Sequence, residues 1–193
     1  GTLSRARLRD FSPECLKKGA HLHLSSYFIQ AGLAHDLGKL LEMAKLEGMS
    51  TSLDPGHDPA GAWDISGISP YLEYLDWFLP NKIEFLSIAG GDDLVASLEK
   101  FAPELPGIVV KAGSEGAYLR FGKDNRVAHC PPFPVDVVDT TCAGDAFNAG
   151  FLMALSIGDS PGAAVMIGNR FGSACSSVMG LPRDKSFFHG INL

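Results

Sequence analysis

The sequence predicts an α/β protein built on a mostly parallel sheet, and three observations support this prediction. Short apolar runs alternate with longer segments whose apolar residues recur every three or four positions, as in successive βαβ units. The chain has 193 residues, which is enough to bury a core, and we expect a single domain over residues 1–193. No internal repeat or low-complexity tract interrupts the alternation.

The first half of the chain predicts two strands that flank a helix. Residues 20–25 alternate at period two, which is typical of a strand. Residues 33–47 place leucines and an alanine on one stripe and predict a helix. Residues 51–54 form a short apolar run that ends at a loop rich in proline and glycine, so a second strand is expected. A short helix over 68–75 and a short strand over 77–79 follow.

The second half of the chain continues the alternation and ends in two helices. A buried strand, a pair of antiparallel strands around a polar turn, and amphipathic helices are expected there. In chain order, the predicted elements are helices at 83–88 and 92–101, strands at 108–111, 116–121 and 126–129, a helix that begins near 144, and a helix at 162–178.

Composition and charge exclude several classes of protein. The net charge of −6 argues against nucleic acid or an anionic membrane as a main partner. No apolar run is long enough to span a bilayer, and the arginine-containing start of the sequence lacks the apolar core of a secretory signal. The four cysteines form no CxxC pair and are expected to be free thiols in a reducing cytoplasm.

Residues 139–150, Asp-Thr-Thr-Cys-Ala-Gly-Asp-Ala-Phe-Asn-Ala-Gly, are the most informative stretch. Small residues end at Asp145, and Phe147 and Phe151 then follow at helical spacing, so a helix begins at the glycine. The start of a helix carries unpaired N–H groups and attracts anions. A carboxylate at that place suits a phosphoryl-transfer base that accepts a hydroxyl proton. The simpler alternative is that Asp145 only stabilises the helix dipole.

This stretch resembles the signature D-T-x-G-A-G-D-x-F-x-x-G of the PfkB (ribokinase-like) carbohydrate kinases. The resemblance implies a three-layer αβα ribokinase-like fold with Asp145 as the catalytic base. It also implies that the backbone amides of Cys142, Ala143, Gly144 and Asp145 form an anion hole for the transferring phosphate. Cys142 stands where the common pattern has glycine, and a left-handed backbone there would strain a cysteine.

The resemblance covers residues from about 20 to 180, which correspond to the C-terminal two-thirds of such a kinase domain. In the family, the preceding part supplies the first strands, the sugar-binding glycine motif and a small β lid. None of these is recognised here, so we expect a fragment, a short member or one piece of a longer protein.

Asn81 and Glu84 resemble the N-x-x-E motif through which the family organises the Mg²⁺ bound to ATP. Asn followed three residues later by Glu is also a helix capping box, and the two interpretations are compatible. Lys111, Gly113 and Gly116 resemble the segment that holds the nucleotide, whereas the alternative is a tight turn with a solvated lysine. The sequence contains no G-x-x-x-x-G-K-[ST], which disfavours a P-loop kinase.

Three further positions match family sites. Asn169 falls where members line the adenine and ribose pocket, although it is also explained as a polar residue on a helix flank. Asp139 and Thr141 match a monovalent-cation site, with K⁺ as the candidate ion, and the alternative is a turn that Asp139 caps through Thr141.

Two other features depart from a simple family match. The loop after residue 54 has Gly56 and Asp58 where many members have asparagine and arginine. His21 and His23 share one strand face without an evident third metal ligand, so we interpret them as structural or partly exposed.

Together these features predict an ATP-dependent phosphotransferase that phosphorylates the CH₂OH group of a sugar or sugar-like substrate, with Mg²⁺ as the accompanying ion and K⁺ as a candidate second ion. A nucleoside or vitamin-like alcohol kinase of the same fold is one alternative, because fold does not fix the substrate. A non-catalytic nucleotide-binding pseudokinase is the other. We expect no nucleic-acid or membrane partner, and the family suggests a homodimer through a lid that is not recognised in this sequence.

Overall fold

The computed structural model describes residues 3–10, 13–122 and 124–180. The helices are α1 (Pro13–Lys18), α2 (Ala31–Ala34), α3 (Leu37–Leu46), α4 (Lys82–Ala89), α5 (Leu94–Lys100), α6 (Ala143–Ser156) and α7 (Pro161–Ser176). The strands are β1 (His21–Ser25), β2 (Ser50–Asp54), β3 (Trp77–Phe78), β4 (Gly107–Lys111), β5 (Ala117–Phe121) and β6 (Val127–Cys130). Short 3₁₀ helices lie between them, one of them at Ser69–Tyr74.

The six strands form one sheet whose order follows the chain, β1-β2-β3-β4-β5-β6. The pairs β1–β2, β2–β3 and β3–β4 are parallel. Strands β5 and β6 are neighbours joined by a short connection at 122–126. Because parallel neighbours would need a crossover of about a dozen residues, these two strands run antiparallel. The prediction of an α/β protein with a mostly parallel sheet is confirmed.

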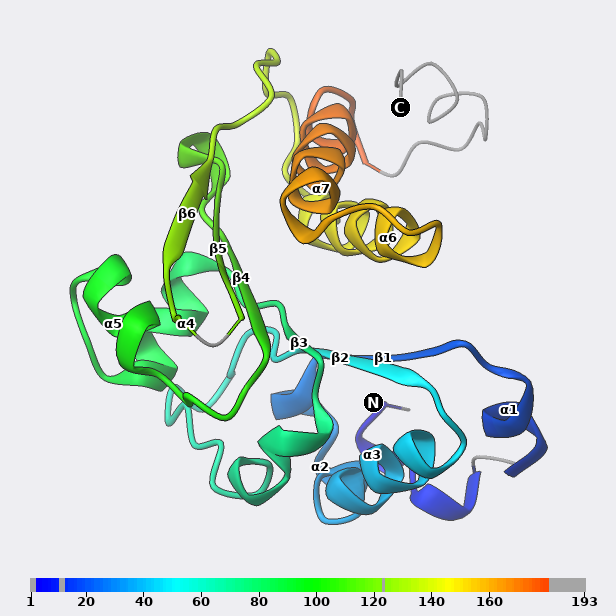
Figure 1. Cartoon of the computed structure of the whole chain (residues 1–193). Coiled ribbons are helices and arrows are strands. Elements are labelled where there is room, and N and C mark those ends of the chain that lie inside the picture. Colours follow the sequence, from blue (N-terminus) through cyan, green and yellow to red (C-terminus); the bar gives the residue numbers. More distant parts are fainter. Residues whose placement is uncertain (1–2, 11–12, 123, 181–193) are drawn as a thin grey trace. The chain divides into compact units, whose positions relative to one another are not determined.

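The described chain divides into two compact units (Figure 1). Unit 1 holds the residues up to Val109 together with Arg120–Val127, and unit 2 holds Val110–Leu119 and the residues from Ala128 onward. The single domain expected over 1–193 stays a prediction.

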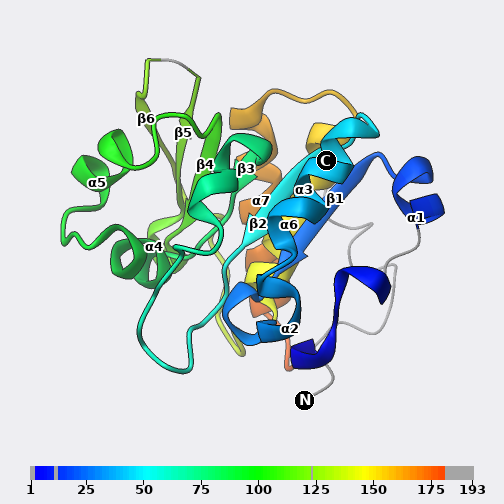
Figure 2. The same ribbon diagram turned by 90° about the horizontal axis from the view of Figure 1, so that it is seen from below.

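Helix α3 covers one side of β1 and β2 (Figures 1 and 2). Its residues Leu40, Leu41 and Ala44 are fully buried, and it packs against β2 and the 3₁₀ helix at Ser69–Tyr74. The single helix predicted over 33–47 is instead two helices, α2 and α3, with His35 and Asp36 between them. Asp36 donates its backbone N–H to Leu33 in a tight turn, which explains the break.

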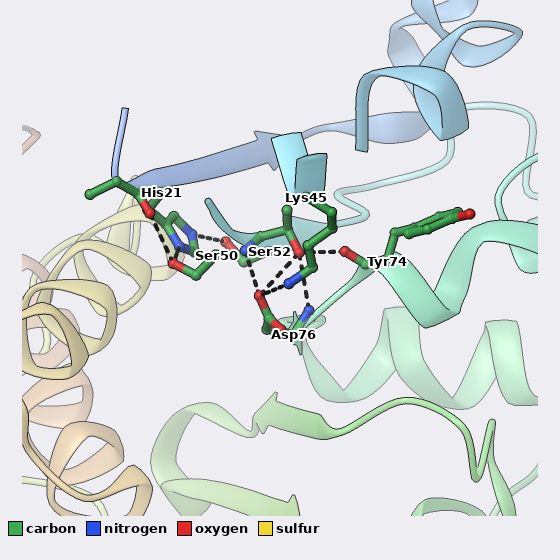
Figure 3. Close-up of polar contacts among 8 residues, drawn as sticks. His21, Lys45, Ser50, Ser52, Tyr74 and Asp76 are labelled. Atoms are coloured by element: carbon green, nitrogen blue, oxygen red, sulfur yellow. Dashed lines mark hydrogen bonds and ion pairs between the residues drawn. The ribbon is translucent and has the colours of Figure 1, made fainter. Parts of the chain in front are cut away.

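The opposite side of β1 and β2 is polar (Figure 3). The parallel register places His21 beside Ser50 and His23 beside Ser52. The His21 ring contacts the hydroxyls of Ser50 and Ser52, each at 2.7 Å, and the His23 ring contacts Ser52 at 2.7 Å. Burial, and next the neighbouring His23, lower the pKa of His21 to about 4. This agrees with the structural interpretation of the two histidines.

An ion pair next to this polar side links α3 to the start of β3 (Figure 3). Lys45 Nζ lies 2.5 Å from Asp76 Oδ2, which also accepts the backbone N–H of Thr51 at 2.8 Å. The Thr51 hydroxyl donates to the Tyr74 carbonyl. These bonds satisfy the groups that join helix to sheet, so they stabilise unit 1.

In unit 2, helices α6 and α7 lie side by side (Figure 1). Glycines allow the close approach, because a Cβ on Gly168 would lie 3.0 Å from the Phe147 ring. A Cβ on Gly172 would lie 3.1 Å from the Ala143 carbonyl oxygen. Helix α7 therefore packs directly against the first turn of α6, which is the turn that the sequence singled out.

Candidate active site

The first turn of α6 has an unusual entry. The residue before the helix, Cys142, adopts a left-handed conformation with φ 60° and ψ 10°. Its side chain makes no capping bond, in contrast to Asn81, Asp93 and Ser160 at the starts of α4, α5 and α7. A left-handed non-glycine residue is strained by about 1–2 kcal/mol and is found most often at functional sites.

The amides of this turn are largely unpaired. The N–H of Ala143 donates to the Thr140 carbonyl at 3.1 Å. The N–H groups of Cys142, Gly144 and Asp145 have no hydrogen-bond partner among the described residues. Such groups at the start of a helix favour an anion. Of the four amides predicted for the anion hole, three are thus open to a ligand and one is already used.

The carboxylate of Asp145 is exposed on the same turn. It forms no hydrogen bond or ion pair within the part of the chain that the structure describes. An exposed carboxylate without an internal partner can accept a proton from a bound hydroxyl, which is the role of a general base.

Lys111 at the end of β4 reaches this turn. A Cβ built on Gly144 would lie 3.6 Å from Lys111 Nζ, so the ammonium lies beside the first turn of α6. Lys111 Nζ also donates to Asn148 Oδ1 at 3.2 Å. Sequence reasoning missed Asn148, although one signal was available: it is a polar residue beside Phe147 in the apolar middle of α6.

The segment predicted to hold the nucleotide, around Gly113 and Gly116, is a tight turn that packs closely against β6 and the residues after it. Gly113 and Gly116 have φ of 58° and 86°, which explains why glycine occupies both positions. A Cβ on Gly116 would collide with the Cys130 carbonyl and lie 2.7 Å from Pro132 N. His129 in β6 also contacts the Glu115 carbonyl at 2.6 Å.

Asn169 on α7 holds the segment that follows β6. Its amide nitrogen donates to the carbonyls of Cys130 at 3.3 Å and Pro131 at 2.9 Å. The side chain is 8% exposed, so its structural role is clear and its role toward a nucleotide stays a prediction. Asn169 and Gly116 thus contact the same short segment.

Asp139 organises the approach to α6. Its Oδ1 accepts both the backbone N–H of Thr141 at 2.9 Å and the Thr141 hydroxyl at 2.6 Å. Its Oδ2 accepts the N–H of Gly180 at 2.9 Å. These bonds, the Thr141 hydroxyl first, lower the pKa of Asp139. The predicted turn cap is confirmed, and the cation site stays a prediction.

Asn81 and Glu84 belong to unit 1 and form a reciprocal capping box at the start of α4. Asn81 Oδ1 accepts the N–H of Glu84 at 2.9 Å, and Glu84 Oε2 accepts the N–H of Asn81 at 2.9 Å. The predicted cap is confirmed. A role toward Mg²⁺ stays a prediction for both residues.

The loop after β2 is held by a carboxylate where many family members have arginine. Asp58 is 6% exposed and accepts the backbone N–H groups of Ala60 at 2.9 Å and Trp63 at 2.7 Å. These bonds, Trp63 first, lower the pKa of Asp58. Asp58 therefore shapes its own loop.

Two negative findings apply to the described residues. They include no group of three or more His, Cys, Asp or Glu side chains that could hold a metal ion by themselves. None of the helices in these residues is both long and apolar enough to cross a bilayer. Within the same residues, Cys130, Cys142 and Cys175 are free thiols, and burial raises the pKa of Cys130 and Cys175.

Comparison with known proteins agrees with the fold. The family model for pfkB family carbohydrate kinases matches residues 4–184. The chain therefore belongs to the PfkB family of carbohydrate kinases.

Three relatives illustrate the match. An uncharacterized sugar kinase of Archaeoglobus fulgidus is 32% identical over 84% of this chain and 64% of its own length. A fructokinase of Klebsiella pneumoniae is 33% identical over 72% of this chain and 47% of its own length. A structure assigned as a candidate ribokinase II of E. coli, in complex with ATP and Mg²⁺, has a TM-score of 0.78 and 24% identity over 93% of this chain and 58% of that one. The chain spans less than two thirds of each of these proteins.

Proposed function

We propose that the protein transfers the γ-phosphoryl group of ATP to a hydroxymethyl group of a sugar or sugar-like substrate. Asp145 accepts the proton of the attacking hydroxyl, and the amides around Gly144 bind the charge that develops on the transferring group. Membership of the PfkB family supports this class of reaction. The particular sugar is outside the proposal, because a fold does not fix its substrate.

One observation supports this function above the others. The exposed carboxylate of Asp145, the unpaired amides of Gly144 and Asp145, and the ammonium of Lys111 all gather on the first turn of α6. A turn that served only stability would be expected to satisfy its amides with a side-chain cap. A base, a set of donors and a cation at one place are the parts that phosphoryl transfer uses.

The nucleotide would be bound mainly by unit 2. Lys111 would contact its phosphates, and the turn at Gly113 and Gly116 would let its backbone come close to the ligand. Asn169 would shape the adenine and ribose pocket by fixing the segment after β6.

Mg²⁺ would accompany ATP, and Asn81 and Glu84 are the residues proposed to organise it. Their oxygens are hard ligands but already accept capping bonds, and Glu84 is 7% exposed. This fits an ion that keeps several waters and is held largely by phosphate oxygens. When bound, Mg²⁺ would neutralise part of the negative charge of the nucleotide phosphates.

A monovalent cation, with K⁺ as the candidate, is proposed at Asp139 and Thr141. The bonds that lower the pKa of Asp139 keep its carboxylate ionised, which favours a nearby cation. No described side chain completes a cage there, so backbone carbonyls would have to supply the remaining ligands.

A pseudokinase is the second candidate, and the left-handed Cys142 is the observation that favours it. A side chain at this strained position stands beside the amides that would bind phosphate. A nucleoside or other alcohol kinase is distinguished only by its acceptor.

The deciding experiment combines thermal shift with ADP release in the full-length protein, over a panel of sugars, nucleosides and other alcohols. We expect stabilisation by ATP with Mg²⁺, and turnover that Asp145→Asn reduces by about two to four powers of ten, the range for loss of a general base. ATP binding should remain in this variant. Stabilisation without ADP release on any acceptor would identify a pseudokinase, and unchanged kcat in Asp145→Asn would remove the catalytic assignment.

A further inference from the structure

Asn148 is a buried amide that the proposed reaction does not yet use. It lies one helical turn after Gly144 and is 2% exposed. Its neighbours Phe147 and Phe151 in α6 are buried and apolar. Burying an amide is costly unless its polar atoms are hydrogen-bonded, and Asn148 Oδ1 accepts a bond from Lys111 Nζ at 3.2 Å.

The bond fixes the ammonium of Lys111 beside the open amides. Residues 144 and 148 are four apart and face the same side of α6, so a lysine bound to Asn148 also lies against Gly144. Lysine has a flexible four-carbon stem, so an ammonium without a fixed partner samples many rotamers. An acceptor on a rigid helix selects one of these rotamers before a ligand arrives.

We propose that Asn148 is a positioning residue that holds Lys111 Nζ at the phosphate-binding turn of α6. This inference rests on the proposed function, because it assigns the phosphates of a bound nucleotide as the partner of Lys111. Asn148 itself touches neither phosphate nor acceptor.

The neutrality of the amide is central to this role. An aspartate at 148 would accept the same bond, but its charge would cancel that of Lys111 and repel the phosphates. An amide oxygen orients the ammonium without adding a negative charge that would oppose it. A purely structural role would require only that the buried polar atoms be satisfied.

The test is a double-mutant cycle in the full-length protein, with equilibrium titration of ATP and of ADP as the readout. The variants are Lys111→Met, Asn148→Leu, the pair together, and Asn148→Asp. Lys100→Met, which removes an exposed lysine of α5, is the matched control for net charge. Thermal melting of each variant reports whether it is folded.

Loss of Lys111 is expected to weaken ATP binding about tenfold or more, the size of one charge-assisted contact. Asn148→Leu should weaken ATP binding several-fold when Lys111 is present. It should have no further effect on ATP binding in the Lys111→Met variant. Asn148→Asp should match the loss seen in Lys111→Met while melting near the temperature of the unmodified protein. Lys100→Met should bind ATP normally.

Equal effects of Asn148→Leu with and without Lys111 would overturn the inference, as would normal ATP affinity in Asn148→Asp. If Asn148→Leu does not fold, Asn148→Ala, which is also neutral, takes its place in the cycle with and without Lys111→Met. Coupled ATP binding without ADP release from any acceptor would end the kinase proposal and leave this inference standing. Absence of ATP binding in the unmodified protein would overturn both.

Discussion

The starts of helices α4 and α6 differ in how the first backbone N–H groups of the helix find hydrogen-bond partners. At α4, Asn81 and Glu84 exchange two hydrogen bonds and satisfy the first amides internally. At α6, Cys142 takes a strained left-handed conformation and gives no cap, and the amides of Gly144 and Asp145 have no partner among the residues that the structure describes. The first arrangement gains stability, whereas the second gives it up at a place where an anion can restore it.

The strongest test of this comparison at α4 is Asn81→Ala. The change removes the cap bond to Glu84, so the free energy of unfolding should fall by about 1 kcal/mol, the usual value of an N-cap. Denaturant titration measures it. The same substitution at α6, Cys142→Ala, should change stability little, because no cap bond is lost. A similar loss at both positions would erase the distinction between the two helix starts.

A smaller effect of opposite sign is expected for Cys142→Gly. Glycine adopts the left-handed region without strain, which gains about 1–2 kcal/mol, but it loses part of this through the greater freedom of the unfolded chain. The net expectation is a stabilisation of about 0.5 kcal/mol by denaturant titration. Ala149→Gly, inside the same helix, is the control and should lose about 1 kcal/mol. Destabilisation by Cys142→Gly would show that the cysteine side chain has a packing role.

The polar side of β1 and β2 and the turn before α6 should also differ in how their stability responds to acid. This is the smallest of the expected effects. The folded pKa of His21 is about 4, below its ordinary value of 6.5. The unfolded chain therefore binds a proton first, and stability falls as the pH drops from 6.5 toward 4. Asp139, which holds the turn before α6, has a pKa below its ordinary value of 3.8. Its contribution to the stability of the fold is therefore present above pH 3.8 and is lost only as the pH falls through the lower folded pKa.

Thermal melting between pH 7 and pH 4 checks this expectation. His21→Gln should show a shallower loss across this range than the unmodified protein, whereas Asp139→Asn should leave the slope there unchanged. If melting temperature falls equally with pH in His21→Gln and in the unmodified protein, the pKa of His21 is not lowered in the folded state.

Local patterns were enough to predict most of the fold and the start of α6. The alternation of residues 20–25 and the apolar run at 51–54 became β1 and β2, and the spacing of Asn81 and Glu84 became a capping box. The break between α2 and α3 was not predicted, because the apolar residues keep helical spacing on both sides of His35 and Asp36. Only the hydrogen bond from the Asp36 N–H to the Leu33 carbonyl ends the first helix.

The candidate site was predicted in its residues but not in its contacts. The motif located Asp145 and Gly144 because a helix start has a recognisable sequence. The left-handed angle of Cys142, the use of the Ala143 amide by Thr140, and the bond from Lys111 to Asn148 depend on tertiary structure. Lys111 and Asn148 are far apart in sequence and meet only because a strand end and a helix face are brought together.

The central claim is that the first turn of α6 is a phosphate-binding site. Nuclear magnetic resonance of the full-length protein, with the backbone amides assigned, tests it most directly. Addition of ATP should shift the amide signals of Gly144 and Asp145 strongly and leave that of Ala96, which Asp93 caps at the start of α5, nearly unchanged. Shifts at Ala96 equal to those at Gly144, or no shift at Gly144 while ATP binds, would contradict the account.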